Sequence, residues 1–229
     1  MWRIWVIVAA AGSVAAADVY TETFDEGVNA GGWQYGGPGG GIGMTGGNPG
    51  AFWSELGLDT FAPQLRTTQS GSPFTGDFRS RNVTRIGVDL LTQRVDFSAA
   101  GRPLTLMLTS RNGTDDPLDD GAVYFMGANI PLVGEGWKSY DFSVPSQASG
   151  LPAGWAYQEL GPNAPPTANW AAMLADVSEV RFFYGDPTQF FIFQMWDLGA
   201  DNMRIETVPG PGGALVLGAA GLLAGRRRR

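Results

Sequence analysis

Apolar and polar residues alternate along several short segments of this chain, and this period of two constrains its fold most strongly. The clearest run lies within residues 83–97, where Ile86, Val88 and Leu90 are separated by polar residues or glycine. Side chains at every second position of a strand point to the same face, so the run predicts a strand with one buried face. Similar runs occur at residues 19–24, 104–109, 137–144, 179–184, 191–198 and 202–206. Short strands separated by Gly, Pro, Asn and Asp are typical of an all-β sandwich.

One segment, NWAAMLADV, has a helical period instead. Its apolar residues are Trp170, Met173, Leu174 and Val177. This i, i+3, i+4, i+7 spacing predicts one short helix lying on a sheet, and Thr167 or Asn169 can cap it. The glycine-rich stretch 27–50 predicts an irregular surface loop.

Residues 1–17 have the features of a signal peptide. Arg3 precedes an apolar run over residues 4–11, and Ala15-Ala16-Ala17 fits a small-residue cleavage site before Asp18. The alternatives are a buried first strand or a membrane anchor. We expect removal of this segment and a single domain over residues 18–207.

The other end combines a breaker, an apolar run and a charge cluster. The breaker is Val208-Pro209-Gly210-Pro211-Gly212, and residues 213–225 contain only Gly, Ala, Leu and Val. The cluster is Arg226, Arg227, Arg228 and Arg229. An apolar helix followed by arginines predicts a membrane segment whose charged end stays in the cytoplasm.

This order of elements resembles the PEP-CTERM sorting signals of Gram-negative bacteria. That resemblance implies a sorting tail over residues 208–229, an inner-membrane intermediate and processing by an exosortase. The protein would then reach the cell surface, the outer envelope or the extracellular matrix. The family's box usually reads Val-Pro-Glu-Pro, and Gly210 replaces the glutamate here. A plain anchor that is never cut is the alternative.

Composition excludes several functions. The chain has no Cys and no His, so disulfides, Ser-His-Asp chemistry and Cys-His chemistry are excluded and typical zinc sites are disfavoured. Five of the 15 Lys and Arg residues lie in the two ends, which leaves ten against 22 Asp and Glu in residues 18–207, a net charge of −12. Such a surface repels phosphates, so nucleic acid is rejected as a partner.

The order of motifs in residues 19–206 resembles exported jelly-roll domains of the laminin B and carbohydrate-binding-module type. The motifs are ETFDEG, GGW, FTGDF, WAAMLADVSEVRFFYG and DLGADNMRIE. The resemblance implies a jelly-roll β-sandwich whose first and last strands are adjacent. It also implies a structural Ca²⁺ held by Glu22 and Asp201, with Asp25 as a further ligand. The alternative is that these are solvated acids at strand ends.

Aromatic residues in Gly/Pro-rich loops are the candidates for glycan binding, because exposed rings stack on sugar faces. They are Trp33, Tyr35, Trp53, Trp155 and Tyr157. The alternative is that these rings pin the loops to the sandwich, whereas Trp137, Trp170 and Trp196 are expected in the core.

The arrangement of acidic residues in the sequence gives little support for a catalytic site. Asp115, Asp116, Asp119 and Asp120 predict a solvated hairpin loop, with binding of Ca²⁺ or sugar hydroxyls as the alternative. No carboxylate pair stands out as a glycosidase would require. We therefore expect a non-enzymatic exported protein that binds extracellular polysaccharide or adheres. A structural matrix protein without glycan binding is the alternative, and a glycoside-active enzyme is a weaker one.

Overall fold

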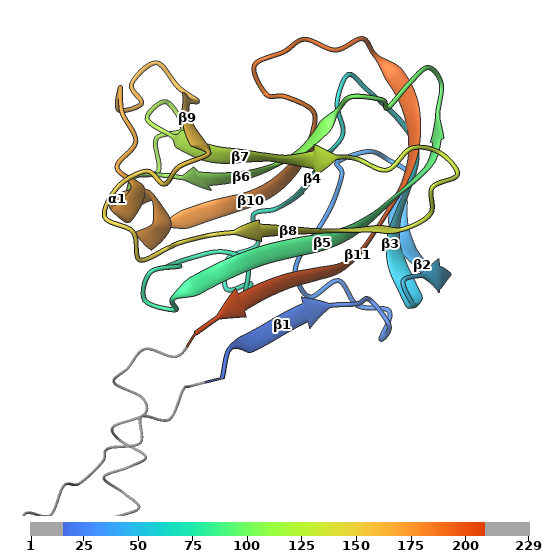
Figure 1. The fold of residues 1–229 in the computed structure, drawn as a ribbon, viewed down its shortest axis with the longest axis horizontal. Coiled ribbons are helices and arrows are strands. Elements are labelled where there is room, and N and C mark those ends of the chain that lie inside the picture. Colours follow the sequence, from blue (N-terminus) through green and yellow to red (C-terminus); the bar gives the residue numbers. More distant parts are fainter. Residues whose placement is uncertain (1–15, 209–229) are drawn as a thin grey trace, which may run out of the picture.

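The computed structural model describes residues 16–208, and in it two antiparallel β-sheets pack face to face (Figure 1). The six-stranded sheet contains β1 (Asp18–Glu22), β2 (Gly40–Gly47), β3 (Gly50–Thr60), β5 (Val83–Val95), β8 (Lys138–Ser143) and β11 (Gln194–Thr207). The five-stranded sheet contains β4 (Gln64–Thr67), β6 (Pro103–Ser110), β7 (Gly121–Asn129), β9 (Trp155–Glu159) and β10 (Val177–Tyr184). The one helix among the described residues is α1 (Trp170–Ala175).

The chain passes repeatedly from one sheet to the other, as in a jelly roll. The strand order is β2-β3-β11-β5-β8 in one sheet and β4-β10-β6-β7-β9 in the other. β1 pairs with the end of β11, from Asp18 opposite Thr207 to Glu22 opposite Met203. The predicted all-β sandwich with one short helix is therefore confirmed, and so is the predicted adjacency of its first and last strands.

The core lies between the sheets and follows the alternation. Ile86, Val88 and Leu90 of β5 are fully buried, as is Trp196 of β11. Trp137 was also expected in the core but is only partly buried.

The predicted helix is confirmed, and it closes one end of the sandwich. Asn169 is its N-cap, accepting a hydrogen bond from Ala172 N at 3.1 Å. Trp170 is buried and packs edge-on against Trp155, with ring centroids 5.0 Å apart. The helix ends at Ala175, and Val177 already belongs to β10.

Several strands of the structure were not predicted from the sequence. The stretch 27–50 was expected to be an irregular loop, but it contains β2, and β3, β4, β7 and β9 were not predicted. β2 has the sequence GGIGMTGG. It shows no alternation because neighbouring segments approach its backbone so closely that glycine is favoured there. A Cβ atom at nearby Gly39 would lie 2.1 Å from the carbonyl oxygen of Leu56, so only glycine, which has no Cβ, fits at this position.

Most of the predicted signal peptide, residues 1–15, and most of the tail, residues 209–229, lie outside the described residues. Val208 is the last described residue, and its N–H donates to Asn82 O at 3.1 Å. Within residues 16–208, no helix has the length and apolarity that crossing a bilayer demands.

Candidate functional site

The outer face of the five-stranded sheet carries rows of side chains that strand register aligns. Directly paired residues point to the same side of a sheet. One row consists of Arg66, Arg181, Met107, Tyr124 and Ala156. The rows on either side are Gln64, Phe183, Thr105 and Met126, and Glu179, Thr109, Ala122 and Gln158.

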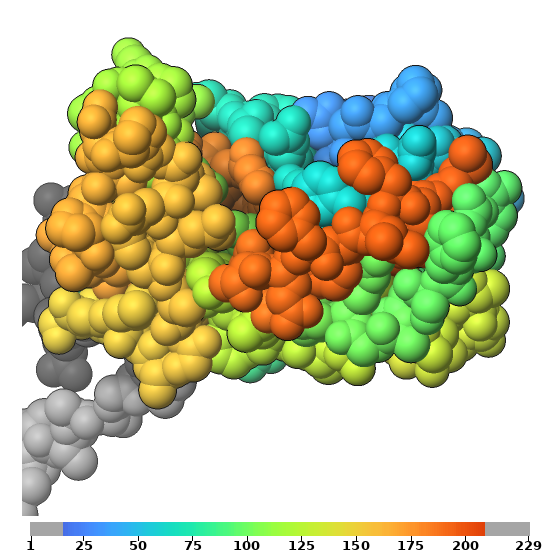
Figure 2. Space-filling view, turned by 90° about the horizontal axis from the view of Figure 1, so that it is seen from above, coloured from blue at the N-terminus to red at the C-terminus, as the bar shows by residue number. Residues whose placement is uncertain are grey.

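A groove of about 240 Å³ crosses these rows. It is lined by Phe61, Met107, Gln158, Leu160, Arg181, Phe183, Pro187, Thr188, Gln189 and Phe190. In Figure 2 the face is hollowed between residues around 150–170 and the red-orange segment before β11. Met107 and Phe183 give it an apolar floor, since both belong to a small buried cluster on this side of the sheet. The groove therefore combines apolar surface with guanidinium and amide donors.

Phe190 forms part of one wall and is fully exposed to solvent. It lies in the 186–193 segment between β10 and β11. Sequence alternation assigned Phe191–Phe193 to a strand, and this was wrong because β11 begins at Gln194. A large ring left in solvent beside a groove is available to stack on a ligand.

Arg102 supports the wall of the groove that contains Phe61 and the 186–193 segment, although it does not line the groove. Its guanidinium lies 4.2 Å from the ring centre of Phe191 and 5.1 Å from that of Trp196. Its Nη1 donates to Phe61 O at 2.8 Å. The side chain is buried, and burial lowers its pKa. The cation thus joins the 186–193 segment, Phe61 and β11 through cation–π contacts and one hydrogen bond.

Two arginines and one glutamate lie together on β4 and β10, at one edge of the face. Arg181 Nε donates to Glu179 Oε1, and Arg66 Nη1 lies 3.9 Å from Glu179 Oε2. Glu179 is buried, whereas the Arg66 side chain is 42% exposed. The Glu179 carboxylate is therefore the shared ion-pair partner of Arg66 and Arg181.

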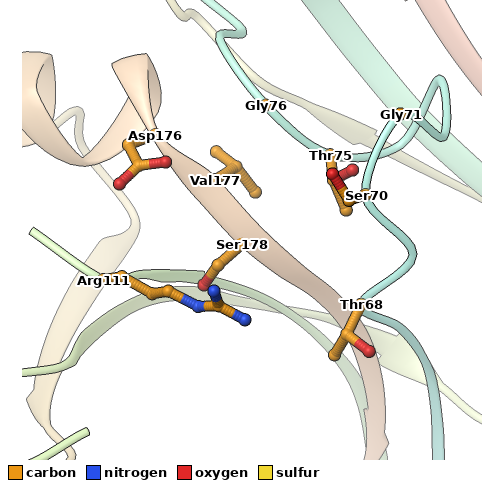
Figure 3. A pocket seen from close by; sticks show the side chains of 9 residues that line it. All are labelled: Thr68, Ser70, Gly71, Thr75, Gly76, Arg111, Asp176, Val177 and Ser178. Carbon is orange, nitrogen blue, oxygen red and sulfur yellow. The ribbon is translucent and has the colours of Figure 1, made fainter. Parts of the chain in front are cut away.

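A second pocket, of about 160 Å³, lies at the end of the same sheet (Figure 3). Four hydroxyl-bearing residues line it, together with Arg111 and Asp176. No ion pair joins these two charged residues within the described chain. Asp120 lies nearby; burial raises its pKa, and neighbouring carboxylates including Asp119 raise it further. Acids surround Arg111 here, so this pocket is poorly suited to an anion.

The expectation that loop aromatics form the glycan-binding surface was wrong for three of the five rings. Trp33, Tyr35 and Trp155 are buried in the main core. Trp33 stacks on Phe182 at 5.7 Å, and the Tyr35 hydroxyl lies 2.6 Å from that of a buried tyrosine in β10. A sugar cannot reach these faces.

The other two candidates are partly buried. Trp53 packs against Phe24, with ring centroids 6.2 Å apart. The Tyr157 hydroxyl donates to Pro165 O at 2.7 Å. Their contacts fit the alternative, in which rings pin loops to the sandwich.

Glu22 and Asp201 lie on adjacent strands but on opposite faces of the six-stranded sheet. Glu22 is paired with Met203, whose side chain is in the core. Asp201 is paired with Asp89, which alternates with core residues of β5 and so faces outward. A direct calcium bridge between the predicted ligands does not fit this geometry.

Each of these carboxylates already has backbone donors. Glu22 Oε2 accepts from Gly31 N at 2.6 Å, and Asp201 accepts from Asn48 N and from the next residue's N–H, both at 2.7 Å. Asp25 accepts instead from the backbone of β3 at 2.9 Å. Within residues 16–208 no group of three His, Cys, Asp or Glu side chains could hold a metal ion.

The acidic run 115–120 lies in the connection between β6 and β7, as predicted for a hairpin loop. The groove residues themselves were missed in the sequence. Phe61, Met107 and Arg181 belong to strands or short connections, and nothing in the sequence shows which face of each strand is covered. The useful signal was the run QFFIFQMW at residues 189–196, which has more apolar residues than one strand face can bury.

No family model and no curated protein matches this chain. Among solved structures it is similar to a family 11 carbohydrate-binding module from Clostridium thermocellum, with 15% identity, a TM-score of 0.43, and 82% of this chain and 94% of the module covered. It is similar to an exo-beta-agarase, with 13% identity, a TM-score of 0.46, and 87% of this chain and 25% of the agarase covered. It is also similar to the L4b domain of human laminin alpha-2, with 12% identity, a TM-score of 0.38, and 91% and 98% covered. These neighbours include both kinds of jelly roll that the sequence resembles.

Proposed function

We propose that this chain is a non-catalytic domain that binds polysaccharide outside the cell. The groove on the outer face of the five-stranded sheet carries this proposal. It is open to solvent, with an apolar floor and a fully exposed ring at Phe190. Gln158, Gln189 and Arg181 supply polar groups at its sides. Sugar chains present this combination of surfaces, since their rings have apolar faces and hydroxylated edges.

The chemistry of the groove favours binding over hydrolysis. None of the described residues that line it carries a carboxylate. Glycoside hydrolysis generally requires two carboxylic acids on either side of the scissile bond. We therefore assign no catalytic role to the groove.

Affinity electrophoresis through gels that contain a soluble polysaccharide tests the proposal. Phe190→Ala should abolish most of the retardation, because it removes the exposed stacking surface without touching the core. Phe97→Ala is the matched control, since Phe97 is 72% exposed but does not line the groove. Equal retardation of both variants and the unmodified protein would reject this groove as the site.

We also propose that the protein is exported and sorted. The signal-peptide pattern of residues 1–17 and the box, apolar run and arginine cluster of residues 208–229 support this proposal. The partners would be an exosortase and, in the precursor, the inner membrane. Mass spectrometry of the protein from the cell surface is the test. A mature chain that ends near Val208 supports sorting, whereas intact terminal arginines indicate a plain anchor.

A structural matrix protein is the second candidate. Its support is the apolar surface beside the groove, where Ile192 and Phe193 are 62% and 66% exposed. This candidate predicts self-association without polysaccharide, which analytical ultracentrifugation measures. A monomer that binds polysaccharide would reject it.

A further inference from the structure

We propose that the groove selects an anionic polysaccharide, one that carries carboxylate or sulfate groups, and that Arg66 and Arg181 contact these groups. The inference rests on the proposed function and adds the class of ligand to it. It starts from the placement of charge on this face.

Strand register places Arg66 and Arg181 directly opposite each other on β4 and β10. Like charges at such positions repel and destabilise a sheet. One carboxylate, that of Glu179, lies between them. This edge of the face, formed by β4 and β10, therefore carries two cations and one anion, although residues 18–207 have a net charge of −12.

Both guanidinium groups have N–H donors that make no hydrogen bond within residues 16–208. Arg181 uses its Nε for Glu179, and its two terminal nitrogens donate no hydrogen bond within residues 16–208. Arg66 makes its one ion pair at 3.9 Å and is 42% exposed. A guanidinium with free terminal nitrogens binds a carboxylate or a sulfate through two parallel hydrogen bonds.

The position of these donors suits a ligand in the groove. Arg181 is the one charged side chain among the described residues that line it. It is paired with Met107, which forms the apolar floor, and Phe183 lies two positions further along β10. A sugar ring resting on this floor would place an acidic substituent at Arg181. Arg66 lines a separate hollow rather than this groove, but it lies directly opposite Arg181 on β4.

The acidic remainder of the domain does not prevent such binding. The six-stranded sheet faces the opposite side of the sandwich (Figure 1). Packed sheets lie about 10 Å apart, and charges separated by more than roughly 8 Å are largely screened at physiological salt. What opposes the two arginines at the groove is therefore local: the carboxylate of Glu179 between them and that of Asp186 beside Thr188.

The test compares three probes with the purified protein: polygalacturonate, carrageenan and a neutral mixed-linkage β-glucan. We expect one of the two anionic polymers to bind about tenfold or more tightly than the neutral one, with affinity falling as salt is raised. The two anionic arms separate carboxylate from sulfate as the recognised group.

Two variants locate the contact. Arg66→Gln should weaken binding of the preferred anionic polymer about tenfold and leave neutral glucan unchanged. Arg181→Gln should have the same effect. Because this change leaves Glu179 with fewer partners, the fold of the Arg181→Gln variant is checked by circular dichroism. If that variant unfolds, Arg66→Gln is the test. Arg85→Gln is the matched control, because Arg85 is 56% exposed and ion-paired on the other sheet.

Each outcome is decisive. Equal affinity for neutral and anionic polymers, or unchanged anionic binding by Arg66→Gln, overturns the inference and leaves the proposed function standing. If Arg66→Gln loses neutral and anionic binding together, the inference is also overturned. If no polysaccharide of either kind is bound, the proposed function fails and the inference fails with it.

Discussion

Replacement of Asp201 by Asn should change how the stability of the domain depends on pH. Asp201 is fully buried on β11. Burial raises the pKa of its carboxyl to about 6 from an ordinary value of 3.8, and the charges of Asp89 and Asp25 add to the rise. The N–H donors of Asn48 and Asn202 oppose it without cancelling it. The folded domain therefore holds this proton more tightly than the unfolded chain does.

The sign and the size of the effect follow from linkage. A raised pKa in the folded state gives stability that is fully present below about pH 3.8 and is lost as the pH rises through about 6. At 1.36 kcal/mol for each pKa unit, the difference amounts to about 3 kcal/mol. Asn cannot ionise, so the variant lacks this pH dependence, although its amide offers one acceptor oxygen where Asp201 accepts from two backbone N–H groups. The Asp201→Asn variant should therefore gain about 2–3 kcal/mol relative to the unmodified protein between about pH 4 and about pH 7.

Urea unfolding at several pH values measures this directly. Glu22, Glu55 and Asp120 also have pKa values that burial raises, so the difference between two proteins is the informative quantity. Asp59→Asn is the control, because this carboxylate is exposed on β3. If the unfolding free energies of Asp201→Asn and the unmodified protein stay parallel over this pH range, the assigned cause is wrong.

Three further predictions concern packing, the groove wall and metal. Trp170→Ala should lower the unfolding free energy by about 3–5 kcal/mol, because a buried ring that packs on Trp155 leaves a cavity, and a near-neutral change in chemical denaturation would contradict this. Arg102→Gln should speed chymotryptic cleavage within residues 186–193 and weaken polysaccharide binding, because the cation–π contact to Phe191 is lost. Arg102→Lys should restore part of both, and unchanged cleavage in Arg102→Gln would exclude the positioning role. A chelator should leave the melting temperature unchanged; a clear fall would reveal a metal ion that the Glu22 and Asp201 geometry does not accommodate.

Alternation identified strands where one face is buried and the other is polar. It succeeded for β5 and β8, whose outward positions include Arg85, Asp89, Ser139 and Asp141. It failed for β7, GAVYFMGAN, because Ala122 and Tyr124 are covered on the outer face while Val123 is buried in the core. It failed for β2 because glycine was selected there by close backbone approach.

The candidate site was harder to predict than the fold. A tryptophan in a glycine-rich loop looks accessible in sequence, but Trp33 enters the core beside Phe74 at 4.9 Å. Conversely, Phe190 belongs to an apolar run that resembles a buried strand and is fully exposed. Exposure depends on how distant segments cover one another. Register between β4 and β10 likewise decides that Arg66 meets Arg181.

The pairing of Asp18 with Thr207 brings the beginning and the end of the domain to one corner. That corner belongs to the six-stranded sheet, whereas the groove lies on the outer face of the five-stranded sheet, which forms the other layer in Figure 1. A domain tethered through either end would thus hold its groove away from the surface that carries it. Many copies on one surface could then engage a single long polymer together, and weak individual sites would combine into strong, multivalent attachment.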